Sequence, residues 1–379
     1  MVNNANHTGK IDIKSLEKAQ LITVLENLGE KKFRATQIFE WLYKQHVSSF
    51  DDMNNLSKSL REQLKSHFKL PSAQIITMQE SKDDTRKYLI SFSDNVCVEA
   101  VGIPNKNNLT VCFSTQAGCA MGCIFCATGQ HGFTRNLTCG EMFDQIFLVG
   151  QNFGMRVSNV VAMGQGEPFL NYEAMLQVLH LINNEKYLNI GARHITVSSC
   201  GLLNGIEKFS KEPEQFTLAI SLHSAIQEKR AMLMPGVAHV DLSELKNTLK
   251  MYGDNTKRRP SLEYVLIQNI NDGEEDLDAL INFSHGMLCH VNLIPLNTTK
   301  KDSSACRDTK INTANGNLKI SPNKANAKNA SETISLLPSK SINHFKHALQ
   351  SHGIEVSIRN SRGADIDGAC GQLHQRVFN

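Results

Sequence analysis

The sequence is poor in aromatic residues, in proline and in net charge. Aromatic residues make up 6% of the 379 residues, and there are one tryptophan and nine prolines. Lys and Arg total 40 against 37 Asp and Glu, which excludes a wholly polybasic protein but not a locally basic nucleic-acid site. No apolar stretch approaches the ~20 residues of a membrane helix, and the polar start MVNNANHTGK lacks the apolar segment of a secretory signal. We therefore expect a cytoplasmic protein with no membrane segment.

Cysteine, in contrast, is abundant. Ten cysteines in a cytoplasmic chain need an explanation other than structural disulfides, because reducing compartments keep thiols free. Four of them, Cys112, Cys119, Cys123 and Cys126, fall within fifteen residues. This local density is the most informative feature of the sequence.

The amino-terminal residues 1–75 predict a small helical domain, because leucines recur at mostly helical spacing between residues 16 and 28. From Lys10 to Lys69 there are eleven Lys and Arg against eight Asp and Glu. This excess equals the net charge of the whole chain. A solvated helical face explains the charge as well as an RNA-docking surface does, so both interpretations stay open at this point.

Strand-like and helix-like segments alternate from residue 110 onwards. Such alternation predicts βαβ units and a parallel sheet, in which ligands gather at the carboxyl ends of the strands. Six repeats fit either an open sheet or most of a barrel. The expected strands are 110–114, 157–163, 194–198, 216–222, 262–267 and 291–296, and the expected helices are 138–152, 171–184, 201–210, 241–253 and 275–285.

Three further segments complete the expected organisation. Residues 76–109 predict a β-rich linker, since they contain two short strand-like runs around a turn. Residues 299–340 are rich in Asn, Ser, Lys and Ala with few large apolar residues, which predicts a flexible polar insertion within a core of 110–379. A helix, a last strand near 354–359 and a glycine-rich loop carrying Cys370 follow.

Cys119, Cys123 and Cys126 form a C-x3-C-x2-C run directly after an expected strand. One loop of this spacing can wrap three thiolates around a single metal centre. A structural zinc site is closed by four ligands, and ordinary electron-transfer clusters use four cysteines. Three ligands instead suit a 4Fe-4S cluster with one open iron. The alternatives are a zinc loop completed by Cys112 or Cys139, or buried unpaired thiols.

This spacing is that of the radical S-adenosylmethionine (SAM) superfamily, and the chain resembles the superfamily at a second motif. Met163-Gly-Gln-Gly-Glu-Pro168 follows the next strand, where the superfamily has a glycine turn and an acidic residue that hold the SAM amine. Glycine permits close backbone approach, and a carboxylate can pair with an ammonium group. The resemblance implies an α/β fold, a partial (β/α)6 barrel with a helical amino-terminal accessory domain.

Within the superfamily the chain resembles the RlmN/Cfr group of RNA adenosine methyltransferases over nearly its whole length. The RlmN-like glycine turn and GFxRNL segment favour the RlmN branch, which methylates adenine C2, over the Cfr-like branch, which methylates C8. The departures are Gln165 in the glycine turn and the insertion after Asn297. The matching segments are CFSTQAGC at 112–119, GFTRNL at 132–137, SLH at 221–223, LIPLN at 293–297 and DIDGACGQL at 365–373.

The resemblance implies a role for individual residues. Cys119, Cys123 and Cys126 would bind the cluster. Cys370 would become S-methylated, Cys112 would resolve the intermediate, and Glu99 would act as an acid-base residue. The SAM pocket would be lined by Gly166, Glu167, Ser198, Ser221, Leu222, His223 and Asn297.

The implied reaction uses two SAM molecules per turnover. One methylates Cys370, and the other is reductively cleaved to a radical that activates this methyl group for addition to adenine C2. Cys112 then releases the product by forming a transient disulfide. The implied substrates are an adenosine of 23S rRNA and the adenosine next to the anticodon in tRNAs. An electron donor such as flavodoxin or ferredoxin and a monomeric state are also expected. The glycines around Cys370 predict a mobile loop.

Two other functions remain as alternatives. A Cfr-like enzyme would methylate adenine C8 instead of C2. A zinc-stabilised RNA-binding module would have no catalytic activity at all.

Overall fold

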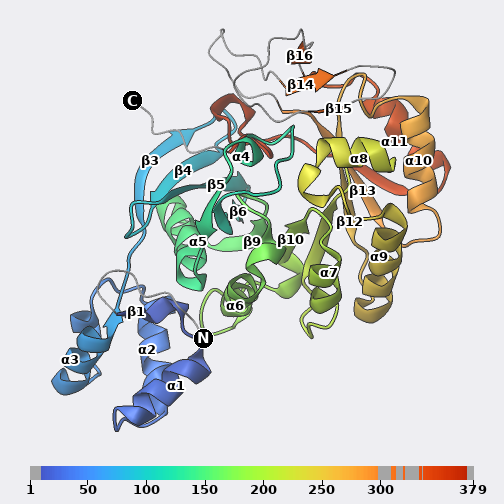
Figure 1. Cartoon of the computed structure of the whole chain (residues 1–379). Coiled ribbons are helices and arrows are strands. Elements are labelled where there is room, and N and C mark those ends of the chain that lie inside the picture. Colours follow the sequence, from blue (N-terminus) through green and yellow to red (C-terminus); the bar gives the residue numbers. More distant parts are fainter. Residues whose placement is uncertain (1–9, 298–308, 313–318, 321–332, 335, 374–379) are drawn as a thin grey trace.

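The computed structural model describes residues 10–297, 309–312, 319–320, 333–334 and 336–373. Its central feature is a ten-stranded sheet with the order β17-β13-β12-β11-β10-β9-β6-β5-β4-β3 (Figure 1). The seven strands from β17 to β6 are parallel. These strands are β6 (Asn108–Cys112), β9 (Val157–Ala162), β10 (Ile195–Ser199), β11 (Thr217–Ser221), β12 (Ser261–Leu266), β13 (His290–Pro295) and β17 (Glu355–Ile358).

Helices connect successive parallel strands and give six β/α units followed by a seventh strand. The six expected strands and five expected helices are confirmed, with ends within three residues of those observed. The longest helices have 15 residues, and no helix in the described ranges has the length and apolar character to cross a membrane. The helices are α5 (Cys139–Phe153), α6 (Tyr172–Asn183), α7 (Leu203–Phe209), α8 (Gln227–Leu233), α9 (Leu242–Thr256), α10 (Glu274–Ser284) and α11 (Ile342–Ser351).

Helix α5 illustrates how local sequence sets these elements. Thr138 caps its start, because its hydroxyl accepts from the Glu141 amide at 3.2 Å while the Glu141 carboxylate accepts from the Thr138 amide at 2.8 Å. The helix ends at Gly154, whose φ of 62° favours glycine. Its buried residues include Met142, Phe143 and Ile146, and the helix packs against the sheet at β6 and β9.

Residues 74–105 extend the same sheet with three antiparallel strands, β3 (Gln74–Glu80), β4 (Arg86–Ser91) and β5 (Cys97–Asn105). The segment 76–109, which the sequence predicts as a linker, is therefore hydrogen-bonded to the parallel strands through β5 and β6. Strand β3 was not expected. Its side chains alternate between half-buried and exposed, as on the edge of a sheet.

The amino-terminal region is helical, as predicted. Figure 1 shows its three helices grouped at one end of the molecule. A short parallel pair, β1 (Ile11–Asp12) and β2 (Phe68–Lys69), closes the region by joining its two ends. The other elements are η1 (Ile13–Ser15), α1 (Lys18–Asn27), α2 (Phe33–Tyr43), η2 (Phe50–Asp52) and α3 (Lys58–His67).

The expected insertion at 299–340 lies largely outside the described residues. Three short strands within it form an antiparallel sheet, β14 (Thr309–Asn312), β15 (Lys319–Ile320) and β16 (Thr333–Ile334). Residues 336–340 return to the barrel, where the Gln268 amide donates to the Leu337 carbonyl at 2.9 Å. The cysteine loop is framed by β7 (Gln116–Gly118), α4 (Ala127–Gln130) and β8 (Phe133–Asn136). The remaining 3-10 turns are η3 (Pro168–Asn171), η4 (Ala192–His194), η5 (Pro235–Val237) and η6 (Ala364–Ile366).

A buried ion pair joins the amino-terminal region to the barrel. Lys14 Nζ lies 2.8 Å from Asp144 Oδ1 in α5, and both side chains are at most 3% exposed. His46 Nε2 lies 2.9 Å from the same oxygen, and the His46 ring stacks on Phe147. Gly140 makes the approach possible, since a Cβ there would come within 2.3 Å of Lys14 Cβ.

We predict that Asp144→Ala will lower the free energy of unfolding by about 3–5 kcal/mol, because it leaves the buried Lys14 ammonium without its counter-charge. The double variant Lys14→Met/Asp144→Leu should lose much less, since it removes both charges. Urea unfolding curves of the two variants and the parent measure this difference. Equal losses in both variants would show that packing, not charge, joins the two parts.

Candidate active site

A pocket opens at the carboxyl ends of the parallel strands, where ligands are expected in such sheets. It is lined by residues from every strand end between β9 and β17. Ten of the thirteen predicted site residues line it: Cys119, Cys123, Cys126, Gly166, Glu167, Ser198, Ser221, His223, Asn297 and Cys370. Leu222 is fully buried beside the pocket, Cys112 lines an adjoining cavity, and Glu99 lies outside both.

The cysteine loop is held by a small two-stranded sheet of β7 and β8. Gly118 permits its entry turn, because φ is 75° there and a Cβ would lie 2.1 Å from the Gly132 carbonyl oxygen. The Cys119 amide donates to that same oxygen at 2.8 Å. The three cysteine side chains are half-buried and line the pocket.

The three sulfurs lie too far apart in this structure to bind one zinc ion together. A zinc ion with Zn–S bonds of about 2.3 Å needs its sulfurs within roughly 4 Å of one another. Among the described residues, the sulfurs of Cys119, Cys123 and Cys126 do not all lie within 4.8 Å. Burial raises the pKa of Cys119 to about 11 and that of Cys123 well above its usual value. A bound metal must therefore displace these protons.

The glycine turn after β9 is shaped by close backbone contacts. Gly166 has a φ of 100°, and a Cβ there would lie 2.5 Å from Gln116 Cβ. The two Glu167 carboxylate oxygens accept from the Phe169 amide at 3.1 Å and from the Cys200 amide at 2.7 Å. Burial raises the pKa of Glu167, while the Cys200 hydrogen bond lowers it. Glu167 therefore fixes two turns as well as facing the pocket.

Ser198 and Ser199 both line the pocket but differ in their contacts. The Ser199 hydroxyl is buried and accepts from the amides of Gly201 at 3.1 Å and Leu202 at 3.4 Å. It stabilises the turn after β10. Ser198 is only half-buried, so its hydroxyl is the more accessible of the two to a bound molecule.

His223 follows β11 with a φ of 54°, an uncommon conformation for a residue other than glycine. Its Nδ1 accepts from the Val265 amide at 3.0 Å, and its ring meets Phe125 edge to face. Burial, with a smaller effect of Arg230, lowers its pKa to about 3. His223 is therefore neutral at physiological pH and carries its proton on Nε2.

Cys370 and Cys112 come together although they are 258 residues apart in the sequence. Both line a second cavity that shares Arg359, Met163 and Leu373 with the first pocket. Burial and the neighbouring Cys370 raise the pKa of Cys112 to about 12. The Cys370 side chain is exposed toward the cavity, yet the surrounding protein raises its pKa, and Arg359 counteracts this increase.

Arg359 was not identified from the sequence. Its Nη1 lies 3.6 Å from Glu263 Oε2, and Glu263 also accepts from Asn292 Nδ2 at 2.8 Å and from Ser261 Oγ at 2.8 Å. Its position in the sequence could have identified it as a candidate site residue, because Arg359 directly follows the last parallel strand, β17. This network holds a guanidinium that lines both cavities.

Glu99 is fully buried on β5, and its Oε1 lies 3.2 Å from Lys87 Nζ. Lys87 Nζ also donates to the Asp367 carbonyl at 3.5 Å, three residues before Cys370. Glu99 is thus linked to the Cys370 loop through Lys87 rather than facing the pocket directly.

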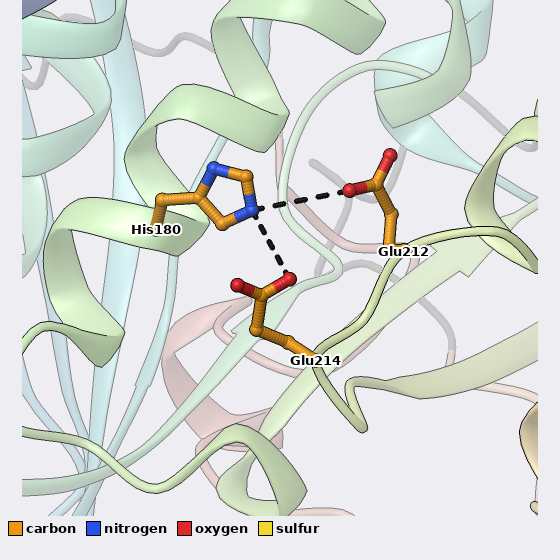
Figure 2. A group of neighbouring side chains, drawn as sticks. All are labelled: His180, Glu212 and Glu214. Carbon is orange, nitrogen blue, oxygen red and sulfur yellow. Dashed lines mark hydrogen bonds and ion pairs between the residues drawn. The ribbon is translucent and has the colours of Figure 1, made fainter.

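A separate group of metal-type ligands lies at the opposite end of the strands. His180, in the last turn of α6, has its Nε2 3.3 Å from Glu214 Oε2 and 4.0 Å from Glu212 Oε2 (Figure 2). Tyr172 donates to the other Glu212 oxygen at 3.1 Å. The three side chains are at least partly exposed, and their contacts are explained by these surface ion pairs and the tyrosine.

Comparisons with known proteins agree with this geometry. The family described as "Ribosomal RNA large subunit methyltransferase N-terminal domain" matches residues 11–70, and the "Radical SAM superfamily" matches residues 113–281. The chain is 41% identical to a probable dual-specificity RNA methyltransferase RlmN of Clostridium novyi, over 93% of this chain and 95% of the relative. It is 40% identical to a protein of the same name from Lachnospira eligens, over 97% of each.

A solved structure is also similar. The crystal structure of a radical SAM methyltransferase from Sphaerobacter thermophilus superposes with a TM-score of 0.80 at 36% identity, over 96% of this chain and 99% of that one. The likeness covers both the helical amino-terminal region and the sheet. It confirms the predicted α/β barrel with a helical accessory region.

We predict that His223 makes stability depend on pH. Below its unfolded pKa of about 6.5, the unfolded chain gains a proton at this site that the folded chain excludes. The free energy of unfolding therefore decreases as the pH is lowered. Between pH 6.5 and 5 this contribution amounts to about 1.6 kcal/mol. Unfolding curves of the parent and His223→Gln at several pH values measure it as the difference between their slopes. Parallel pH profiles would contradict the lowered pKa.

Proposed function

Because the chain belongs to the RlmN family of radical SAM methyltransferases, we propose that it methylates carbon 2 of an adenosine in 23S rRNA and of the adenosine next to the anticodon in tRNAs. One observation carries this proposal. Cys112 and Cys370 share a cavity that adjoins the pocket of the cysteine triad. A reaction that passes a methyl group through one cysteine and releases it with another requires this arrangement.

Cys119, Cys123 and Cys126 would hold a 4Fe-4S cluster, as the radical SAM family implies. When bound, the cluster and two SAM molecules per turnover supply the methyl group and the one-electron chemistry that the electron-poor adenine C2 requires. The half-buried triad faces the pocket, which leaves access for SAM beside it.

The SAM pocket would be formed by the strand ends. We assign the amine of SAM to Glu167, whose buried carboxylate lines the pocket. Gly166 permits close backbone approach. Ser198, Ser221 and Asn297 would provide polar contacts. The side chain of Leu222 is buried, so it would contribute through its position next to Ser221 and His223 rather than through its side chain.

Cys370 would accept the methyl group as a thiolate, since the thiolate is the nucleophile. Arg359 supports this role because its guanidinium opposes the rise in the pKa of Cys370 that burial causes. After transfer to the base, the Cys112 thiolate would attack the Cys370 sulfur. This step forms the S–S bond and breaks the bond from that sulfur to the bridging carbon, which keeps the electron pair and takes up a proton to become the methyl group of the released RNA. External thiols would reduce the disulfide.

Glu99 would act in the proton transfer that follows addition to the base. Its link to Asp367 through Lys87 supports a connection with the Cys370 loop. A proton relay through Lys87, or a shift of this loop, would be needed for the buried carboxylate to reach a substrate.

The amino-terminal region would dock RNA. Lys31 and Lys32 are exposed beside Phe33, which is 49% exposed at the start of α2, and the Arg34 guanidinium lies 4.9 Å from the Phe33 ring centroid. Cations around an exposed aromatic ring suit a nucleic-acid surface. The target adenosine would have to leave its stack to reach the pocket. A flavodoxin- or ferredoxin-like electron donor, a monomeric state and a cytoplasmic location complete the proposal.

We predict that anaerobically reconstituted Cys370→Ala will retain iron and sulfide but lose RNA methylation, because it lacks the methyl acceptor. Cys112→Ala should accumulate a covalent protein–RNA adduct, since no thiol releases the product. Cys289→Ala serves as the control, because Cys289 precedes β13 at the end of the sheet away from the pocket.

Mass spectrometry of digested 23S rRNA and tRNA, offered separately, measures the product. Recovery of 8-methyladenosine alone would favour the Cfr-like alternative. A colourless protein with about one zinc would favour the non-catalytic module. Turnover by Cys370→Ala would contradict the role of Cys370.

We also predict that Lys31→Gln/Lys32→Gln will weaken RNA binding and make it less dependent on salt. Losing two phosphate contacts should reduce the slope of log affinity against log salt by about 1.4–1.8. The matched control is Lys211→Gln/Lys250→Gln, two exposed lysines of the barrel. Binding titrations at several salt concentrations measure the slopes. Equal slopes for both double variants would place the docking surface elsewhere.

A further inference from the structure

Arg230, in α8, is a charged side chain that is completely buried. Its Nη2 donates to the Cys200 carbonyl at 2.6 Å. Among the described residues, its Nε and Nη1 have no hydrogen-bond acceptor. Burying a cation costs several kcal/mol unless an opposite charge lies close. A buried arginine with spare donors therefore indicates an anionic group nearby.

Helix α8 is fixed against the cysteine loop. The Ile124 amide donates to the Leu233 carbonyl at 3.1 Å, and the Gly236 amide donates to the Met121 carbonyl at 2.9 Å. Gly236 permits this contact, since a Cβ there would lie 2.7 Å from Met121 Cα. Both ends of the loop segment 121–124 are thus tied to the helix end that follows Arg230.

The charge of Arg230 lies beside a residue that contacts this loop. The Cys200 thiol donates to the sulfur of Met121, which lies in the loop two residues from both Cys119 and Cys123, at 3.4 Å. The Cys200 peptide group lies between two charges, because its carbonyl accepts from Arg230 and its amide donates to Glu167. Arg230 is therefore held in place behind the cysteine triad.

A small anion in the pocket is a poor candidate for the missing partner. Arg230 is fully buried and is not among the residues that line the pocket, so a carboxylate of a bound molecule would not reach it. The thiolates of the triad are covalently part of the loop that α8 holds. They become anionic together when the site is loaded.

We propose that Arg230 is a positioning residue that supplies a fixed positive charge to the cysteine triad, so that the bound cluster is retained and is reduced more easily. The inference rests on the proposed function, because it requires the cluster. Charge, burial and hydrogen bonding around the sulfurs set the reduction potentials of such clusters. A nearby cation favours the reduced form, which carries one more negative charge.

The test separates the charge of Arg230 from its hydrogen bond. Arg230→Lys keeps a cation but loses the planar guanidinium group with its several donors, whereas Arg230→Gln keeps an amide donor but loses the charge. Arg193→Gln is the matched control, because Arg193 precedes β10 at its amino end and bonds to Gln215 on the surface. Each full-length chain is reconstituted anaerobically without RNA, and its iron and sulfide are counted. An EPR-monitored titration with dithionite then gives the ratio of reduced to oxidised cluster.

We expect Arg230→Gln to lower this ratio about tenfold at a fixed potential, equivalent to about 59 mV for one electron. Arg230→Lys and Arg193→Gln should stay within twofold of the parent. The proposal is overturned if Gln and Lys variants both match the parent, if Lys alone is impaired, or if both lose the cluster equally. A parent chain that binds no iron and sulfide would instead refute the proposed function itself.

Discussion

The candidate site depends on the fixed position of the segment that carries Cys370. On one side, the Ala127 amide and the Thr128 hydroxyl bond the carbonyls of Gly371 and Leu373 at 2.8 and 2.6 Å. On the other side, Arg362 bonds Asp83 in the β3–β4 turn at 3.0 Å. These two anchors stretch the segment across the carboxyl ends of the strands. Cys370 therefore lies between the cysteine loop and Cys112, which is the geometry that methyl transfer and release would need.

Paired charges surround this segment and connect the strand ends. Lys87 and Glu99 are buried and join the neighbouring strands β4 and β5, whereas the half-buried Arg359, at the end of β17, reaches Glu263 on β12 across β13. Such pairs contribute little net stability, since desolvation offsets much of their attraction. Their main effect is on side-chain orientation, because each charged group holds its partner in one position. Arg230 differs from them because its spare donors face no described acceptor, and this difference is why it indicates the triad thiolates, which become anionic when the site is loaded.

The sequence predicted the parts of the site that follow from spacing and order. The alternation of strands and helices placed the residues after each strand at one end of the sheet, and the pocket contains Glu167, Ser221 and Asn297 there. It did not predict Arg230 or Arg359, because an arginine within a helix or after a strand is usually exposed. The full burial of Arg230 and the partial burial of Arg359 result from tertiary packing. Gly363, Gly368 and Gly371 predict a mobile loop, and the anchors described above lie at its two ends, at residue 362 and at residues 371 and 373.

The same reasoning applies to the amino-terminal region. Charge alone could not separate a solvated surface from an RNA-binding one, and the structure adds that the region is joined to α5 through the buried Lys14–Asp144 pair. In the proposed function, this joint would hold the surface around Phe33 at one position relative to the pocket. A substrate that contacts both must then adapt its own shape, which favours RNA loops whose target base can unstack. In this proposal, the buried pair would connect the stability of the fold with the choice of substrate.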